Sequence, residues 1–165
     1  MNKHVHILKL ADIFYGLTLA QLELVAEICQ EKVYALGEDI LTEGGSSDEL
    51  YVICEGEVEI LIDPGLVSDQ PTPASPVVVA KFWRGQSFGE VALVDRGLRS
   101  ATARAAQDNT HVLALPRSAV IDLCEQHPQL GYRLMHNMAI DLALKLRLID
   151  LRTREGWLYR KRPAA

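Results

Sequence analysis

Residues 49–63, ELYVICEGEVEILID, have the pattern of two β-strands joined by a tight turn. Apolar and β-branched side chains are frequent on both sides of Glu55-Gly56, and such residues favour strands. Glycine tolerates the positive φ that short hairpin turns require, so Gly56 marks the turn. The stretch therefore predicts an antiparallel hairpin.

Further short segments of the same kind lie on both sides of this hairpin. They are rich in Val, Ile, Leu and Tyr, and most are separated by glycines or other turn residues. They are residues 32–36, 39–43, 76–83, 101–107 and 111–116. Many short strands at this spacing indicate a sandwich, barrel or jelly roll. Residues 64–76 hold four prolines and are predicted to be a loop between strands of one domain.

The first 30 residues have helical periodicity. Residues 17–29 place their apolar side chains on one helix face, and Thr18 is a suitable N-cap with Gln21 three residues later to complete a capping box. Residues 7–17 predict a shorter helix that ends at Gly16. We therefore expect N-terminal helices before the strands.

Helical periodicity returns after Pro116. Residues 117–126 predict one helix, and residues 129–161 predict one long helix. One apolar face of the long helix holds Leu130, Leu134 and Met138, and a second holds Met135, Leu142, Leu146 and Ile149. A helix with two apolar faces has two surfaces to cover. We expect one face to pack on the strands and the other to form a homodimer.

Together these patterns predict an α+β fold, in which an antiparallel β-roll (jelly roll) is flanked by N-terminal helices and a long C-terminal helix. The expected organisation is one domain. Its N-terminal helices occupy residues 1–30, its β-roll residues 31–115, and its C-terminal helices and basic tail residues 116–165.

Charge is distributed unevenly. The net charge is −5, but residues 1–144 hold 10 Lys and Arg against 20 Asp and Glu, whereas residues 145–165 hold seven against two. An acidic body argues against general nucleic-acid binding. The basic tail is interpreted as a solvated helix face. With Trp157 and Tyr159 it is also the candidate docking segment for a partner, and a tail packed on its own domain is equally favoured.

No apolar run approaches the roughly 20 residues that span a bilayer. The N-terminal segment is interrupted by Lys9 and Asp12, unlike a secretion signal. We therefore expect a cytoplasmic protein without a membrane partner. The three cysteines are far apart and lie among apolar neighbours, so free, buried thiols are expected rather than a disulfide framework.

Residues 85–105, GQSFGEVALVDRGLRSATARA, carry the candidate binding site. Glu90 and Arg99 stand nine residues apart among small residues and glycines. A carboxylate accepts hydrogen bonds from sugar hydroxyls, and a guanidinium matches the geometry of phosphate oxygens. Residues 87–94 fit a short helical turn whose first amides would add to an anion site. From spacing alone, however, a structural ion pair between Glu90 and Arg99 is favoured.

This stretch resembles the phosphate-binding cassette of the cyclic-nucleotide-binding domain family. The family pattern, G-x-x-F-G-E followed by R-[AST]-A-[ST], is matched by Gly85, Phe88, Gly89 and Glu90 and then by Arg99, Ser100, Ala101 and Thr102. Upstream, the family's turn glycines and apolar strand are matched by Gly37, Gly44, Tyr51, Ile53 and Gly56. The resemblance covers nearly the whole chain.

The resemblance implies a role for each residue of the cassette. Glu90 would accept a hydrogen bond from the ribose 2′-hydroxyl, and Arg99 would pair with the exocyclic phosphate of a 3′,5′-cyclic nucleotide. The phosphate cradle would be completed by the amides of Gly89, Val91, Ala92 and Ser100 and by the Ser100 hydroxyl. The expected ligand is cAMP or cGMP, with cAMP favoured and no metal required. Leu93 and Val94 would couple the cassette to the long helix.

The chain departs from the family pattern at two positions. Leu98 stands where a proline often precedes the arginine, which should matter little. Lys145 stands where some members carry a hydroxyl residue that meets adenine, and a lysine cannot accept a hydrogen bond. Lys145 would instead donate to the base or reach a phosphate, but solvation at the surface is favoured.

These features predict a stand-alone regulatory module that binds a cyclic nucleotide and signals to a protein effector through its long helix. The chain shows no kinase signature and no helix-turn-helix after that helix, so no DNA-binding domain is expected. One alternative is an interaction subunit of the same fold that binds no nucleotide. Arg99→Lys would distinguish the two, by weakening binding at little cost in stability. An enzyme with cupin-like metal ligands is not favoured, because His111 alone among the five histidines lies on a predicted strand.

Overall fold

The computed structural model describes residues 2–63, 75–95 and 97–160, with side chains except those of Ala92 and residues 149–160. The N-terminal helical elements are α1 (Val5–Leu8), the 3₁₀ turn η1 (Asp12–Phe14) and α2 (Leu19–Glu27). The strands are β1 (Gln30–Tyr34), β2 (Asp39–Leu41), β3 (Glu49–Glu55), β4 (Glu57–Ile62), β5 (Val77–Trp83), β6 (Ser87–Phe88), β7 (Thr102–Ala105) and β8 (Thr110–Pro116). The remaining helices are α3 (Glu90–Asp95), α4 (Arg117–Gln126) and α5 (Pro128–Arg160). The predicted loop at residues 64–76 lies largely outside the described residues.

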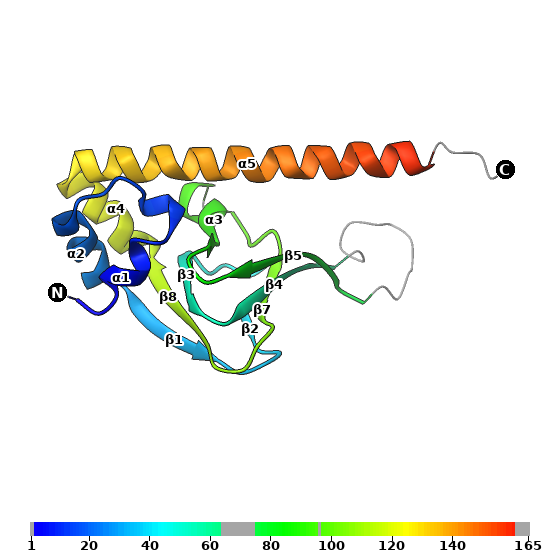
Figure 1. Ribbon diagram of the computed structural model, residues 1–165, viewed down its shortest axis with the longest axis horizontal. Helices are drawn as coiled ribbons and strands as arrows, with labels where there is room; N and C mark the ends of the chain where they lie inside the picture. The colour runs from blue at the N-terminus through cyan, green and yellow to red at the C-terminus, as the bar shows by residue number, and fades with distance from the viewer. Residues whose placement is uncertain (1, 64–74, 96, 161–165) are drawn as a thin grey trace.

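The strands form two antiparallel four-stranded sheets, with the orders β1-β8-β3-β6 and β2-β7-β4-β5 (Figure 1). The expected α+β roll with flanking helices is therefore confirmed. The predicted pairing of β3 with β4 is wrong, because the chain passes from one sheet to the other at Gly56. Its φ is +90°, and a Cβ there would lie 2.5 Å from Thr110 Oγ1. The sequence indicates the turn at Gly56, but the change of sheet depends on strand partners that are distant in the sequence.

Strand β3 is buried on both faces, which explains its uninterrupted apolar run. Leu50 and Val52 pack against the helices in one core cluster. Tyr51 and Ile53 point the other way, into a second cluster between the sheets. Strand β8 pairs with β3 and has the same character, with Leu113 shared with the helices. The two strands therefore form the wall between the roll and the helices.

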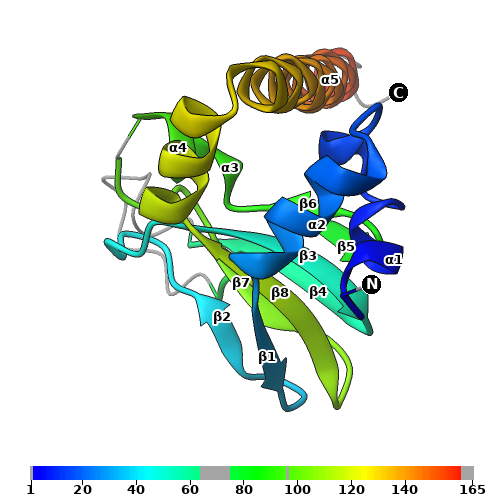
Figure 2. The same ribbon diagram turned by 90° about the vertical axis from the view of Figure 1, so that its left-hand side faces the viewer.

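The helices gather along one side of the roll, and α5 runs across it as the longest element (Figures 1 and 2). The predicted capping box of α2 is confirmed: the Gln21 amide donates to Thr18 Oγ1 at 3.3 Å, and the Thr18 amide donates to Gln21 Oε1 at 2.9 Å. The single helix predicted over residues 7–17 is instead the two short pieces α1 and η1. No helix among the described residues is long and apolar enough to cross a membrane.

The first half of α5 is fixed to the rest of the molecule. Leu130, Leu134 and Met138 are buried in the helix-side core, as predicted for the first apolar face. The side-chain amide of the buried Asn137 donates from Nδ2 to the carbonyl oxygens of Ile13 and Tyr15, at 3.0 and 2.8 Å. These two bonds join α5 to the N-terminal segment, so the two elements form one layer.

The second apolar face of α5 differs from the prediction. Met135 packs against the helix-side core, and the Ile149 side chain lies outside the described residues. Leu142 is half-buried, and Leu146 of the predicted face is 60% exposed. A separate exposed row consists of Ile140, Leu144 and Leu148, whose exposed fractions are 49%, 53% and 57%. These residues recur every four positions and so share one side of the helix.

The three cysteines are free thiols, as predicted, but they are half-buried rather than fully buried. Burial, with a small contribution from Cys54, raises the pKa of Cys29 to about 12. Burial likewise raises the pKa of Cys54 to about 11. Thiols of this kind are poor nucleophiles at neutral pH, because the thiolate is the reactive form.

Candidate functional site

The candidate site lies where β6, α3 and the segment before β7 meet the start of β3. Gly89 connects β6 to α3 with a φ of +82°. A Cβ on Gly89 would lie 2.9 Å from both an Arg99 nitrogen and the Glu49 carbonyl oxygen, so glycine is required by space as well as by φ. At the other end of α3, Arg117 Nε donates to the Leu93 carbonyl oxygen at 2.9 Å. Both ends of α3 are thereby held in place.

Arg99 is buried and joins three segments of the chain. Its Nε donates to Ser47 Oγ at 2.9 Å, and its two terminal nitrogens donate to the carbonyl oxygens of Gly89 at 2.9 Å and Glu49 at 2.6 Å. A guanidinium has five N–H donors. Three of the five have hydrogen-bond partners among the described residues, and the other two have none there. Burial lowers the pKa of Arg99, and nearby acidic and phenolic groups partly offset this effect.

A second layer of polar contacts supports Arg99. Glu49 forms an ion pair with Lys32 at 2.7 Å and accepts a hydrogen bond from the Tyr51 hydroxyl at 2.6 Å. Although burial alone would raise the pKa of Glu49, these two partners hold it below its ordinary value. The Tyr51 ring stacks on Phe88 with centroids 5.1 Å apart. The backbone beneath Arg99 is therefore fixed by both polar and aromatic contacts.

Glu90 is the other buried charge of the site, and its partner comes from α5. Lys145 Nζ lies 2.8 Å from Glu90 Oε1 and 2.7 Å from Asp141 Oδ2, and it donates to the Ser87 carbonyl oxygen at 3.3 Å. The ammonium also lies 5.3 Å from the centre of the Phe82 ring, within cation–π range. Burial alone would lower the pKa of Lys145, but Glu90 and Asp141 raise it above its ordinary value, so the lysine is charged.

Two expectations about these charges are wrong. Glu90 and Arg99 do not pair, because Arg99 is directed at backbone carbonyls and Ser47 while Glu90 faces α5. Lys145 is not a solvated surface residue; its side chain is 27% exposed and that of Glu90 is 7% exposed. A helix running across the roll brings Lys145 to a carboxylate 55 residues earlier in the chain.

The other residues of the cassette lie around the buried side chains of Glu90 and Arg99. Val91 and Ser100 are exposed, Ala92 lies within α3, and Gly89 contacts Arg99 directly. Leu93 is buried in the cluster that includes the first half of α5, which suits a coupling role. Val94 is 57% exposed and makes no comparable contribution.

Ser47 and the Glu49 carbonyl were not anticipated from the sequence. Ser47 is one of two adjacent serines in the segment GGSSD between β2 and β3, and nothing in the sequence distinguishes it from Ser46. The signal that was available is the pair of glycines before it. The Gly44 amide donates to the Arg99 carbonyl at 2.8 Å, and the Arg99 amide donates to the Gly45 carbonyl at 2.9 Å. This pairing brings the segment alongside Arg99.

Within the described residues, no group of three or more His, Cys, Asp or Glu side chains could hold a metal ion. The polar groups of the site are instead a buried guanidinium and a carboxylate in contact with one ammonium. These are groups that bind anions and hydroxyls.

Comparison with known proteins decides the family. The family model described as "Cyclic nucleotide-binding domain" matches residues 31–127, more than half of the chain. The chain belongs to the cyclic nucleotide-binding domain family. Within this domain, the matched range extends from β1 through α4 and contains the cassette, whereas α5 lies beyond it.

Relatives of this domain include regulators and kinase subunits. The chain is 33% identical over 144 residues to the cyclic AMP receptor protein of Thermus thermophilus, covering 87% of this chain and 61% of that protein. It is 28% identical over 131 residues to a cGMP-dependent protein kinase of Drosophila melanogaster, covering 76% of this chain and 16% of the kinase. The chain thus spans less than two thirds of the length of either relative.

Solved structures show the same fold. The catabolite activator protein of Thermus thermophilus has a TM-score of 0.72 and 30% identity, with 87% of this chain and 62% of that chain covered. A cyclic nucleotide-binding domain from Methylobacillus flagellatus has a TM-score of 0.71 and 24% identity, with 99% and 87% covered. The second similarity extends over nearly the whole of this chain, and it concerns the fold alone.

Proposed function

We propose that this domain is a non-enzymatic regulator that binds a 3′,5′-cyclic nucleotide, preferably cAMP, and transmits binding through α5. The observation that carries the proposal is Arg99, which is buried beside Gly89 and keeps two N–H donors without partners among the described residues. In this proposal those donors bind the exocyclic phosphate. Glu90 accepts from the ribose 2′-hydroxyl, and Ser100 with the amides of Gly89, Val91 and Ala92 completes the cradle.

Two observations support the preference for cAMP and the transmission of binding through α5. The preference for cAMP is supported by the 33% identical relative, which is named for cyclic AMP. Transmission through α5 is supported by Leu93, which is buried with Leu130 and Leu134 of that helix. A ligand shifts a conformational equilibrium only if it contacts the two states differently. Leu93 would couple such a difference to α5, because movement of α3 on binding would change the packing of Leu93 against that helix.

A second candidate is favoured by one observation. Lys145 already satisfies Glu90, as expected of a domain that keeps the fold as an interaction subunit and binds no nucleotide. The two candidates differ in whether Arg99 has a ligand.

Calorimetric titration of the protein with cAMP and with cGMP tests the proposal. We expect saturable 1:1 binding with the lower Kd for cAMP, and loss of that binding in Arg99→Ala. A ligand at a hundredfold excess over Kd adds about 2.7 kcal/mol to the free energy of unfolding, so the melting temperature must rise as well. Absence of heat together with an unchanged melting temperature for both nucleotides would favour the second candidate.

We further propose that the domain forms a homodimer through the exposed row of α5, Ile140, Leu144 and Leu148. Leu144→Asp is expected to convert dimers to monomers, because it places two carboxylates in an apolar contact. Sedimentation at several protein concentrations measures this. Leu36→Asp is the matched control, since Leu36 is also an exposed leucine, 65% against 53% for Leu144, but lies between β1 and β2. A wild-type monomer at all concentrations, or equal dissociation of both variants, would contradict the proposal.

A further inference from the structure

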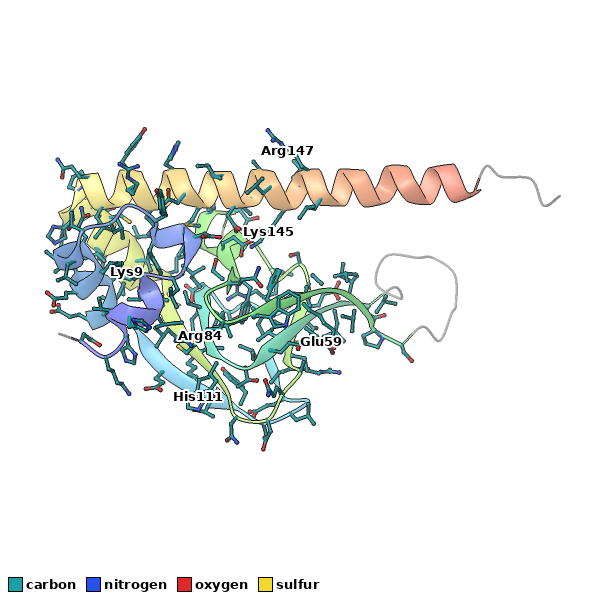
Figure 3. The ribbon with its side chains drawn as sticks, in the orientation of Figure 1. Lys9, Glu59, Arg84, His111, Lys145 and Arg147 are labelled. Carbon is teal, nitrogen blue, oxygen red and sulfur yellow. The ribbon has the colours of Figure 1, made fainter. Side chains whose placement is uncertain are left out.

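The ammonium of Lys145 contacts the carboxylate of Glu90, to which the ribose of the proposed ligand would donate a hydrogen bond. Its contact with Glu90 Oε1, at 2.8 Å, is made at the carboxylate assigned to the ribose 2′-hydroxyl. Figure 3 shows Lys145 on the side of α5 that faces the roll, whereas Arg147, two residues later, points away from it. Of these two basic residues, Lys145 therefore lies on the side of α5 from which Glu90 is contacted, and Arg147 does not.

Lys145 is held by groups from several elements at once. Glu90 begins α3, the Ser87 carbonyl belongs to β6, and the Phe82 ring comes from β5. These contacts hold the Lys145 side chain of α5 within the candidate site. A group that takes the position of the ammonium at Glu90 Oε1 displaces the lysine from that oxygen.

We propose that Lys145 competes with the ribose 2′-hydroxyl for Glu90 and thereby sets both the affinity of the site and its discrimination between ribo- and 2′-deoxyribonucleotides. The inference rests on the proposed function, in which Glu90 binds the ribose. In this proposal the 2′-hydroxyl takes the place of the ammonium at Glu90 Oε1, so its hydrogen bond forms as the Lys145–Glu90 ion pair breaks. A ligand without that hydroxyl gains nothing from Glu90 and leaves the ion pair in place.

Asp141 makes this exchange feasible. It lies one helical turn before Lys145 and 2.7 Å from the same ammonium. When α5 moves away from Glu90, Asp141 moves with it, so the lysine keeps a counter-charge. Removing one member of a buried ion pair is costly because it leaves the other charge uncompensated. Here the lysine remains paired throughout, and the ligand takes over the carboxylate.

The experiment compares cAMP and 2′-deoxy-cAMP by calorimetry on three proteins: wild type, Lys145→Met and Arg147→Gln. Methionine keeps the length and apolar stem of lysine without its charge. Arg147→Gln removes the same charge from the opposite side of α5 and is the matched control. Thermal melting of each variant without ligand verifies that it is folded.

We expect Lys145→Met to bind cAMP about tenfold more tightly than wild type, which corresponds to about 1.4 kcal/mol. Its affinity for 2′-deoxy-cAMP should stay close to that of wild type, so its preference for the ribonucleotide rises by the same factor. Arg147→Gln should leave both affinities unchanged. Binding of cAMP by Lys145→Met alone, with none measurable in wild type, would also support the competition.

Three results would overturn the inference while leaving the proposed function intact. Weaker cAMP binding by Lys145→Met would mean that the lysine contacts the ligand. Unchanged cAMP binding would mean that the ion pair is not exchanged. Equal tightening for both nucleotides would mean that Lys145 acts without reference to the 2′-hydroxyl. Absence of binding in both wild type and Lys145→Met would instead overturn the proposed function itself, and the inference with it.

Discussion

Arg99→Lys is expected to weaken cAMP binding by at least about a hundredfold, since each hydrogen bond to a charged group contributes about 1.5–3 kcal/mol and a pair of them to phosphate is lost. A lysine keeps the charge but not the planar fork. The structure also changes the expectation that this variant is nearly as stable as wild type. One ammonium cannot reach Ser47, Gly89 and Glu49 in the places where the three guanidinium nitrogens donate. Leaving buried acceptors unpaired costs about 1–3 kcal/mol.

Calorimetry measures the affinity of this variant, and urea denaturation measures its free energy of unfolding. Arg104→Lys is the matched control, because Arg104 lies nearby on β7 and pairs with Asp39 at the surface, at 2.6 Å. Exposed pairs contribute about 0–1 kcal/mol, so the control should change neither quantity by much. If Arg99→Lys bound cAMP as tightly as the control does, Arg99 would not be the phosphate ligand.

Gly89→Ala is expected to lower the free energy of unfolding by about 2–5 kcal/mol, from the cost of a left-handed backbone and of an atom placed in a full space. The new Cβ would lie 2.9 Å from the Glu49 carbonyl oxygen, which cannot withdraw easily because Glu49 pairs with Pro116 in the first sheet. It would also lie 2.9 Å from a terminal nitrogen of Arg99. Displacement of Arg99 should weaken cAMP binding at least about tenfold, or about 1.4 kcal/mol.

Gly37→Ala separates the two causes. Gly37 has nearly the same φ, +83°, but nothing lies within 4 Å of the position its Cβ would take. This variant should show only the backbone cost, about 1–2 kcal/mol, with cAMP affinity unchanged. Equal effects of the two substitutions on stability and affinity would mean that the contact between Gly89 and Arg99 has no role in holding the site.

The parts of the fold that the sequence predicted are those encoded by local pattern. Thr18 and Gln21 lie three residues apart and form the capping box without help from distant residues. The run Leu50–Ile53 is apolar at every position, and it became a strand buried on both faces. The same run does not reveal that its strand pairs with β8 and β6 rather than with β4. That choice depends on residues 35 to 67 positions away.

In the candidate site, too, a local motif predicts some features and distant elements determine the others. The cassette residues Gly89, Glu90 and Arg99 follow from a motif within one short stretch. The partners of the two charges do not, because Arg99 reaches a serine 52 residues earlier and Glu90 reaches a lysine 55 residues later. Lys145 was noticed as a departure from the family pattern, but its partner depends on the path of α5 across the roll. A motif predicts which groups are present, and the packing of distant elements determines what they contact.

Strand β8 lies between β1 and β3, so the first sheet cannot be completed until residue 116 has left the ribosome. Until then, β3 has apolar side chains on both faces and lacks the neighbour along one edge. Non-local strand pairs form slowly, and exposed apolar strand edges promote aggregation. The first sheet is therefore completed only after β8 has been synthesised. During that interval the nascent β3 segment exposes apolar side chains that promote aggregation.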